Sequence, residues 1–99
     1  MARALALRYL DVPDAARADY RTRLADRTAS ARACGYHLWA FEQQGAPARV
    51  IEFVEASDEG ALGTALLQDA LLAESLDFVA APESPEGEWQ RFVGIPHAS

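Results

Sequence analysis

Two neighbouring stretches of the chain are apolar on both of their alternating faces. Residues 36–42 read Tyr-His-Leu-Trp-Ala-Phe-Glu, and residues 49–55 read Arg-Val-Ile-Glu-Phe-Val-Glu. Alternation with a period of two is typical of β-strands, and the intervening Gln-Gln-Gly-Ala-Pro-Ala contains the glycine and proline of a hairpin turn. Because a strand with one solvated face is normally polar on that face, we expect protein to cover both sides of this hairpin.

Two further strands and a second helix follow from the same patterns. Residues 4–10 alternate Leu5, Leu7 and Tyr9 with Ala6, Arg8 and Leu10 before an Asp-Val-Pro-Asp turn, and residues 89–95 form the last strand candidate. The sequence Ser-Asp-Glu at 57–59 predicts the cap and acidic first turn of a helix that ends between Glu74 and Asp77. Its expected apolar stripe is Leu62, Leu66, Ala70 and Ala73, widened by Leu67 and Leu71.

A longer helix is predicted between the first strand and the hairpin. It begins at Pro13-Asp14, with Asp14 as its N-cap, and ends near Cys34 before Gly35, a residue that tolerates positive φ. Its apolar stripe is Ala16, Tyr20, Leu24 and Ala31, extending toward Cys34. Five arginines are expected on the solvated outer face of this helix: Arg17, Arg21, Arg23, Arg27 and Arg32.

The order strand, helix, two hairpin strands, helix, strand predicts a ferredoxin-like α+β fold. In this βαββαβ arrangement a four-stranded antiparallel sheet carries both helices on one face, and the other face is bare in a monomer. Since both faces of the hairpin are apolar, an exposed face would form a patch of the kind that marks an interface. We therefore expect a two-fold homodimer whose sheets pack face to face.

The segment from Ile51 to Leu62, Ile-Glu-Phe-Val-Glu-Ala-Ser-Asp-Glu-Gly-Ala-Leu, resembles part of the antibiotic biosynthesis monooxygenases. There, a strand with an inward glutamate leads into a cap and the second helix. The element order of the whole chain is similar to the dimeric α+β barrel superfamily that contains them, and the NIPSNAP-like and stress-responsive barrels fit it equally well. The resemblance implies a paired-sheet dimer with a cavity in each subunit, between sheet and helices, where members bind substrates or haem.

Two departures from the resembled families concern their chemistry. Members commonly carry a histidine near the start of the second helix, where this chain has Gly63, Thr64 and Ala65, and haem-degrading relatives use an asparagine, which this chain lacks. The resemblance thus bears on the fold and the dimer more than on any reaction, and no cofactor is predicted.

The charge and residue content exclude several classes of partner. The net charge of -6 opposes binding to phosphate backbones and anionic membranes. All nine basic residues are arginines, so no lysine can form a Schiff base. Cys34, the single cysteine, cannot form an internal disulfide, and no apolar run reaches the ~18 residues of a membrane span. The two histidines, His37 and His97, have no metal-ligand spacing. We expect one cytoplasmic domain over residues 1–99, without a metal site.

Six residues are candidates for a ligand pocket. His37 and Trp39 lie two apart on one strand and project to the same side, where Trp39 could stack on a planar ligand and His37 act as a base, with Tyr9 nearby. Glu52 interrupts an apolar strand, as do Arg8 and Arg91, so a pair between Glu52 and one of these arginines is expected. The structural alternatives are that the aromatic rings only pack in the core or in the dimer interface, and that the ion pair only fixes the strand register and the dimer. The sequence does not fix whether Glu52 faces the same side as Trp39.

Two functional hypotheses follow. In the first, the dimer binds a small apolar or aromatic molecule in the sheet-helix cavity, as a cofactor-independent enzyme similar to the monooxygenases. In the second, side chains fill that space and the protein is a non-catalytic dimeric interaction or structural module. The sequence leaves open whether there is a reaction at all.

Overall fold

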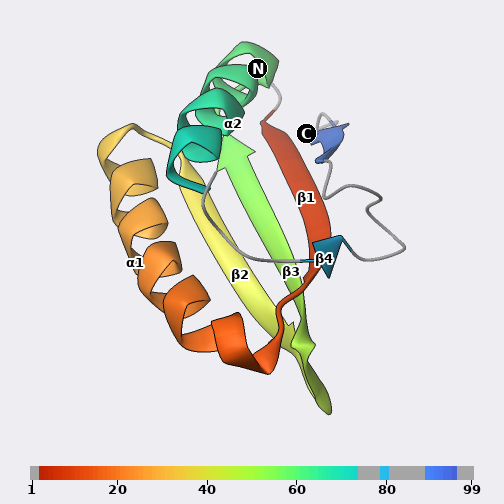
Figure 1. Cartoon of the computed structure of the whole chain (residues 1–99). Helices are drawn as coiled ribbons and strands as arrows, with labels where there is room; N and C mark the ends of the chain where they lie inside the picture. Colours follow the sequence, from red (N-terminus) through yellow and green to blue (C-terminus); the bar gives the residue numbers. More distant parts are fainter. Residues whose placement is uncertain (1–2, 74–78, 81–88, 96–99) are drawn as a thin grey trace.

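The computed structural model describes residues 3–73, 79–80 and 89–95 and places them in one antiparallel sheet with two helices (Figure 1). The elements are β1 (Ala4–Asp11), α1 (Arg17–Ala33), β2 (His37–Gln43), β3 (Ala46–Ala56), α2 (Glu59–Ala73), β4 (Val79–Ala80) and β5 (Gln90–Val93). The strands lie in the order β2-β3-β1, and β4 and β5 both pair with the remaining edge of β1. The predicted ferredoxin-like α+β fold is therefore confirmed.

The hairpin turn is shorter than the sequence suggested. Residues 44 and 45 alone form it, and Gly45 has a φ of 85°, a left-handed conformation that favours glycine. Strand β3 consequently starts at Ala46 and includes Pro47, which the prediction had assigned to the turn. A register shift between Glu42 and Gln43 marks the point where the pairing becomes irregular.

Helix α1 starts differently from the prediction. A 3₁₀ turn over Asp14–Ala16 precedes it, and the Asp14 side chain makes no capping hydrogen bond; it instead accepts one from Arg17 Nη2 at 2.7 Å. The C-terminus is as expected, because Gly35 has a φ of 85° and the Tyr36 amide donates to the carbonyl of Ala31. The chain can therefore turn sharply from α1 into β2.

Helix α2 is capped as predicted, but it buries a narrower stripe. Asp58 Oδ1 accepts a hydrogen bond from the Ala61 amide at 2.7 Å. The buried positions follow helical spacing: Leu62, Ala65, Leu66 and Asp69. Leu67 and Leu71, which were expected to widen the stripe, are 74% and 73% exposed, and Ala70 is exposed too. The predicted end of this helix, between Glu74 and Asp77, lies outside the described residues, as does His97.

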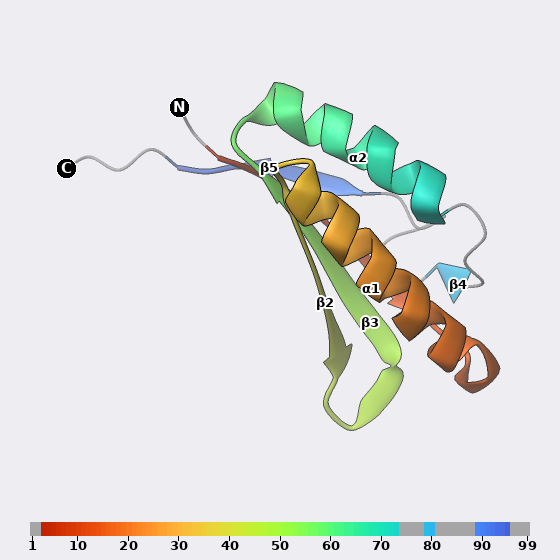
Figure 2. The ribbon, with the colours of Figure 1, turned by 90° about the vertical axis from the view of Figure 1, so that its left-hand side faces the viewer.

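The strand register assigns every side chain of the hairpin to one face of the sheet. Leu38 and Ala40 lie opposite Val54 and Glu52, and these four side chains face the helices. The neighbouring positions point to the opposite side, where Trp39 lies opposite Phe53. Figure 2 shows both helices against one side of the sheet. Within the described residues nothing covers the other side, so the hairpin is apolar on a face that is bare in the single chain.

Two buried apolar clusters fill the space between sheet and helices. The larger is made of Ala4, Ala6, Ala31, Tyr36, Leu38, Val54, Ala56, Leu62, Ala65 and Leu66. The smaller is made of Leu10, Val12, Tyr20 and Val50. None of the described helices is long and apolar enough to cross a membrane.

Candidate functional site

A group of charged side chains is buried between the sheet and the helices. Glu52 projects from β3 toward the helices and has no exposed surface, and neither has Arg27 of α1. Asp69 of α2 is 1% exposed, and Arg8 of β1 is 7% exposed. Burying charges in this way is costly unless they are paired and hydrogen-bonded. Their contacts therefore decide what this charged cluster can do.

Arg27 connects the two carboxylates. Its Nη1 lies 2.7 Å from Glu52 Oε2, and its Nε and Nη2 contact the two oxygens of Asp69 at 2.9 and 2.8 Å. The contact with Asp69 is the two-pronged geometry in which a guanidinium binds a carboxylate most strongly. Arg27 thus holds α1 against both α2 and β3.

Glu52 is the centre of the charged cluster. It accepts hydrogen bonds from Arg8 Nε at 2.8 Å, from both Nη atoms of Arg27, and from the hydroxyl of Tyr20. A carboxylate has about four acceptor positions, so this one is saturated. Tyr20, which is 4% exposed, was expected only as part of the apolar stripe of its helix.

These contacts set the ionisation of the cluster. Burial by itself raises the pKa of Glu52, but the hydrogen bonds and positive charge of Arg27, with Arg8 and Tyr20, lower it to about 2. Burial and the neighbouring Glu52 raise the pKa of the Tyr20 hydroxyl. The pKa of Arg27 is raised, because its bonds to Asp69 and Glu52 outweigh its desolvation. At neutral pH Glu52 is therefore ionised and fully bonded, which makes it a poor general base.

Arg8 is the most exposed member of the charged cluster, although it is only 7% exposed. Its guanidinium carbon lies 4.3 Å from the ring centroid of Trp89, a half-buried side chain just before β5. A guanidinium stacked on an aromatic face and bonded to a carboxylate is held in one orientation. Arg8 and Trp89 therefore form a pre-oriented cation and ring beside the edge of the sheet.

The sheet separates the six residues that the sequence suggested for one pocket. Arg8 and Glu52 face the helices and are paired, as expected for Glu52 with an arginine. His37, Trp39 and Tyr9 point to the bare side, so placing them with Glu52 in a sheet-helix cavity was wrong. The reason is the register: Glu52 lies opposite Ala40, one position from Trp39, and adjacent positions alternate sides. Arg91 lies opposite Ala6 on the helix side, and it is exposed.

The bare side of the sheet carries a band of aromatic residues. The rings of His37 and Trp39 are stacked 5.6 Å apart, and Phe41 meets Phe53 edge to face at 6.0 Å. Trp39, Phe41 and Phe92 are 44%, 56% and 48% exposed. We use the name bare face for the aromatic and aliphatic residues on this side of the sheet, which are Leu5, Leu7, Tyr9, His37, Trp39, Phe41, Ile51, Phe53 and Phe92.

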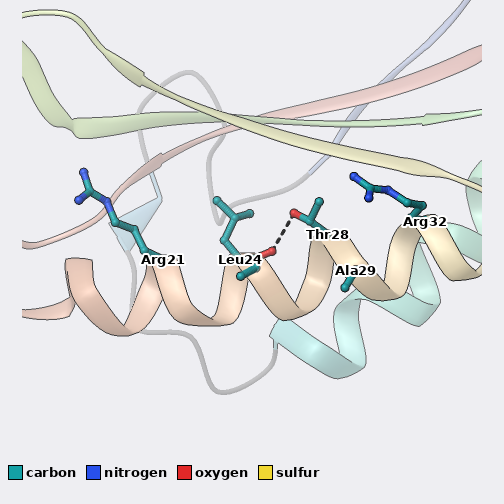
Figure 3. A pocket seen from close by; sticks show the side chains of 6 residues that line it. Arg21, Leu24, Thr28, Ala29 and Arg32 are labelled. Atoms are coloured by element: carbon teal, nitrogen blue, oxygen red, sulfur yellow. Dashed lines mark hydrogen bonds between the residues drawn. The ribbon is translucent and has the colours of Figure 1, made fainter.

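The hollows lined by described residues are shallow, and no residue of the charged cluster lines them. The largest described, about 440 Å³, runs along the flank of α1 and is lined by Arg21, Leu24, Ala25, Thr28, Ala29 and Arg32. In Figure 3 the side chains of Arg21, Leu24 and Arg32 point toward the sheet, and Thr28 donates a hydrogen bond to the carbonyl of Leu24. None of the six candidate residues lines it. The described residues hold no cluster of side chains suited to a metal ion.

Sequence reasoning missed Arg27, Asp69 and Trp89. Arg27 was placed on the outer face of its helix because it is charged, although it follows Tyr20 by seven residues and precedes Ala31 by four. Asp69 likewise follows Leu62 by seven and Leu66 by three. Helical spacing alone, applied without regard to charge, would have placed both side chains in the core.

Comparisons with known proteins bear on the fold. No protein-family model matches the sequence, and no curated protein matches it. Among solved structures it is similar to the crystal structure of a candidate antibiotic biosynthesis monooxygenase from Deinococcus radiodurans, with a TM-score of 0.64 over 100% of this chain and 95% of that one. The sequences are 14% identical. This chain therefore has the same fold as that protein. The resemblance found in the sequence is thus confirmed for the fold, and at this identity the shared fold says nothing about the reaction.

Proposed function

We propose that this chain is one subunit of a homodimeric α+β barrel that binds a small apolar or aromatic molecule between its sheet and its helices. The observation that carries the ligand site is the pair formed by Arg8 and Trp89. The shared monooxygenase fold supports the proposed architecture, and the bare face supports the dimer.

The bare face favours a second copy of the same chain as its partner. Its centre is aromatic and aliphatic, and its edges carry ion pairs between Arg3 and Glu55 and between Arg49 and Asp11, at 2.7 and 2.8 Å. Since these pairs are neutral overall, two copies of this face can approach despite the net charge of -6. An isologous sheet-on-sheet contact would bury the exposed rings, as in other sheet sandwiches.

Arg8 and Trp89 provide the contacts that a small planar ligand needs. The face of the indole that Arg8 does not cover would serve for stacking, and the guanidinium over the other face favours an oxygen that carries partial or full negative charge at the margin of the ring. Glu52 holds Arg8 in place from the side of the core. Such a site would bind a phenol or an enol by its ring and its oxygen together.

The reaction proposed for this site is oxygenation of the bound molecule by molecular oxygen without a bound cofactor, the activity suggested by the description of the similar protein. One oxygen atom would enter the ring, which is oxidised from the phenol to the quinone, and the other would leave as water. Arg8 would stabilise a phenolate or enolate form of the substrate, which is its electron-rich form. Glu52 would act as a positioning residue for Arg8, since its saturated carboxylate is unsuited to taking a proton.

The first test is a native mass spectrum of the purified protein, followed by titration with 1-naphthol. We expect a dimer whose binding of 1-naphthol weakens at least tenfold in Arg8→Leu and in Trp89→Leu. The matched control is Arg23→Leu, which removes a solvated arginine of α1. Equal binding by all four proteins would refute the ligand site, and a monomer at micromolar concentration would refute the dimer. Conversion of 1-naphthol in air then tests the reaction.

A second candidate function is a dimeric interaction or structural module without catalysis. It is favoured by the saturation of Glu52, together with the balance of two arginines and two carboxylates in the buried cluster. The structural role predicts a dimer that carries no bound mass, shows no 1-naphthol binding, and loses stability when the cluster is altered.

A further inference from the structure

Strand β5 and the residue before it carry an open row of side chains on the helix side of the sheet. The register pairs Arg91 with the buried Ala6, so Arg91 lies on that side, as do its neighbours two positions away, Trp89 and Val93. Trp89 is half-buried, whereas Arg91 is exposed and Val93 is 49% exposed. In Figure 1, β5 is drawn in blue and lies beyond β1, away from both helices. A ligand can therefore reach this row from solvent.

Arg91 is the charged member of the row, and it has no partner carboxylate among the described residues. Arg32 and Arg91 form no ion pair with a described residue, whereas every other arginine of the chain does. On the neighbouring strand the charge of Arg8 is balanced by Glu52. Arg91 thus offers its guanidinium, which has donors on two edges, to a group outside the chain.

Arg91 lies next to the ligand site proposed at Arg8 and Trp89. Residues two apart on one strand are separated by roughly 6.6 Å, because a strand rises about 3.3 Å per residue. The long side chain of Arg91 can therefore reach a group at the far end of a ring that is stacked on Trp89. Arg8 is held at the near end, 4.3 Å from the ring centroid of Trp89. The two guanidinium groups are thus placed to contact opposite ends of one flat molecule.

We propose that the site at Arg8 and Trp89 takes hydroxylated aromatic acids, whose carboxylate is bound by Arg91. This inference rests on the function proposed above, in which Trp89 stacks on the ring and Arg8 binds the phenolic oxygen. A guanidinium and a carboxylate are both planar and form two parallel hydrogen bonds. The separation of the two arginines along the sheet favours a carboxylate at the far end of the ring system over one beside the hydroxyl.

A singly charged ligand suits this site better than a doubly charged one. The two arginines and two carboxylates of the charged cluster already balance one another, so Arg91 contributes one uncompensated positive charge. One carboxylate neutralises that charge. A phosphate ester carries close to two negative charges at neutral pH and would leave an excess in a chain whose net charge is -6. The expected class is therefore aromatic carboxylic acids and not aromatic phosphate esters.

The test compares two compounds that differ only in the carboxylate, 2-naphthol and 6-hydroxy-2-naphthoate. By isothermal titration calorimetry we expect the parent protein to bind 6-hydroxy-2-naphthoate at least tenfold more tightly than 2-naphthol. This preference should shrink in high salt, because Arg91 is exposed and its charge is screened. The isomer 3-hydroxy-2-naphthoate, in which the two groups are adjacent, should bind less tightly than 6-hydroxy-2-naphthoate.

Three variants assign the preference to Arg91. Arg91→Gln should lose it and bind 2-naphthol as the parent does, because the ring and hydroxyl contacts remain. Arg91→Lys should keep a smaller preference, since it retains the charge without the two-pronged geometry. Arg32→Gln is the matched control: it removes the other arginine without a described ion pair, at the end of α1, and should keep the full preference.

The outcomes separate this inference from the function on which it rests. Equal affinities of the parent for 2-naphthol and 6-hydroxy-2-naphthoate, or a preference that survives in Arg91→Gln, would overturn the inference and leave the proposed function standing. Arg91 would then only protect the edge of β5 from pairing with other strands. Failure of the parent to bind either compound would overturn both, because the site at Arg8 and Trp89 would itself be refuted.

Discussion

The two faces of the sheet use their side chains in opposite ways. The helix-covered face buries two arginines and two carboxylates in a closed set of ion pairs, whereas the bare face exposes rings to solvent. An ordinary amphipathic sheet has the opposite arrangement, with charged side chains on the solvent-exposed face and aromatic rings on the buried face. The charged cluster instead fixes how α1, α2 and β3 fit together, and the rings remain available for another protein surface. Among the described residues, the single chain therefore buries one face of its sheet and leaves the other bare.

The largest expected effect comes from breaking the charged cluster at Arg27. Arg27→Met leaves Asp69 and part of the Glu52 charge buried without compensation, which costs about 3–5 kcal/mol of unfolding free energy. Urea denaturation at fixed protein concentration measures this loss. Arg23→Met, on the solvated side of the same helix, should change little.

A double variant separates charge from packing at the same position. Arg27→Met combined with Asp69→Leu removes one charge of each sign and leaves Glu52 bonded to Arg8 and Tyr20. It should recover most of the lost stability, because an apolar replacement of a buried ion pair is often neutral. If the double variant is as unstable as the single one, the cost lies in lost packing and the electrostatic account is wrong.

The next effect is the loss of stability in acid. The pKa of Glu52 is about 2 in the folded chain, below its ordinary value near 4.5, so its ionised form favours the folded state. That contribution is fully present above about pH 4.5 and is lost as the pH falls toward 2. A difference of this size corresponds to roughly 3 kcal/mol. Glu52→Gln should lack this share of the acid dependence, and parallel pH profiles for the two proteins would contradict the assignment.

How far sequence could predict this molecule also differs between the two faces. Strands β1, β2, β3 and β5, both helices, the hairpin and the pairing of Glu52 with an arginine followed from periodicity and composition, whereas β4 was not predicted. The burial of Arg27 and Asp69 in the charged cluster was not predicted, because a charged residue on a helix is usually solvated. Only the packing of α1 on α2 in the structure reveals that these two side chains are paired in the core. The assignment of His37 and Trp39 to a face required the hairpin register, which Gly45 and the two-residue turn fix.

A smaller effect is expected where the bare face is altered. Trp39→Arg should raise the dissociation constant of the proposed dimer at least about 30-fold, corresponding to about 2 kcal/mol for a central interface ring. The fold should survive, since Trp39 is already 44% exposed. Sedimentation velocity over a range of concentrations measures both species. Leu67→Glu is the matched control, because Leu67 is equally apolar and more exposed but lies on α2. If Leu67→Glu dissociates while Trp39→Arg remains dimeric, the dimer interface lies on the helices and not on the bare face.

The smallest effect is expected at the rim of the bare face, where arginine-carboxylate ion pairs are exposed to solvent. Arg3 and Glu55 are joined at 2.7 Å, but their side chains are 57% and 26% exposed. Solvent and salt screen such pairs, so Arg3→Ala should alter unfolding in urea by no more than the error of the measurement. Arg3→Ala and Arg27→Met remove the same kind of ion pair, one exposed and one buried. An equal loss of unfolding free energy in the two variants would mean that burial does not determine what such a pair contributes to stability. Because Arg3 lies beside the proposed interface, the experiment is done on the Trp39→Arg monomer, where the rim pair faces only solvent.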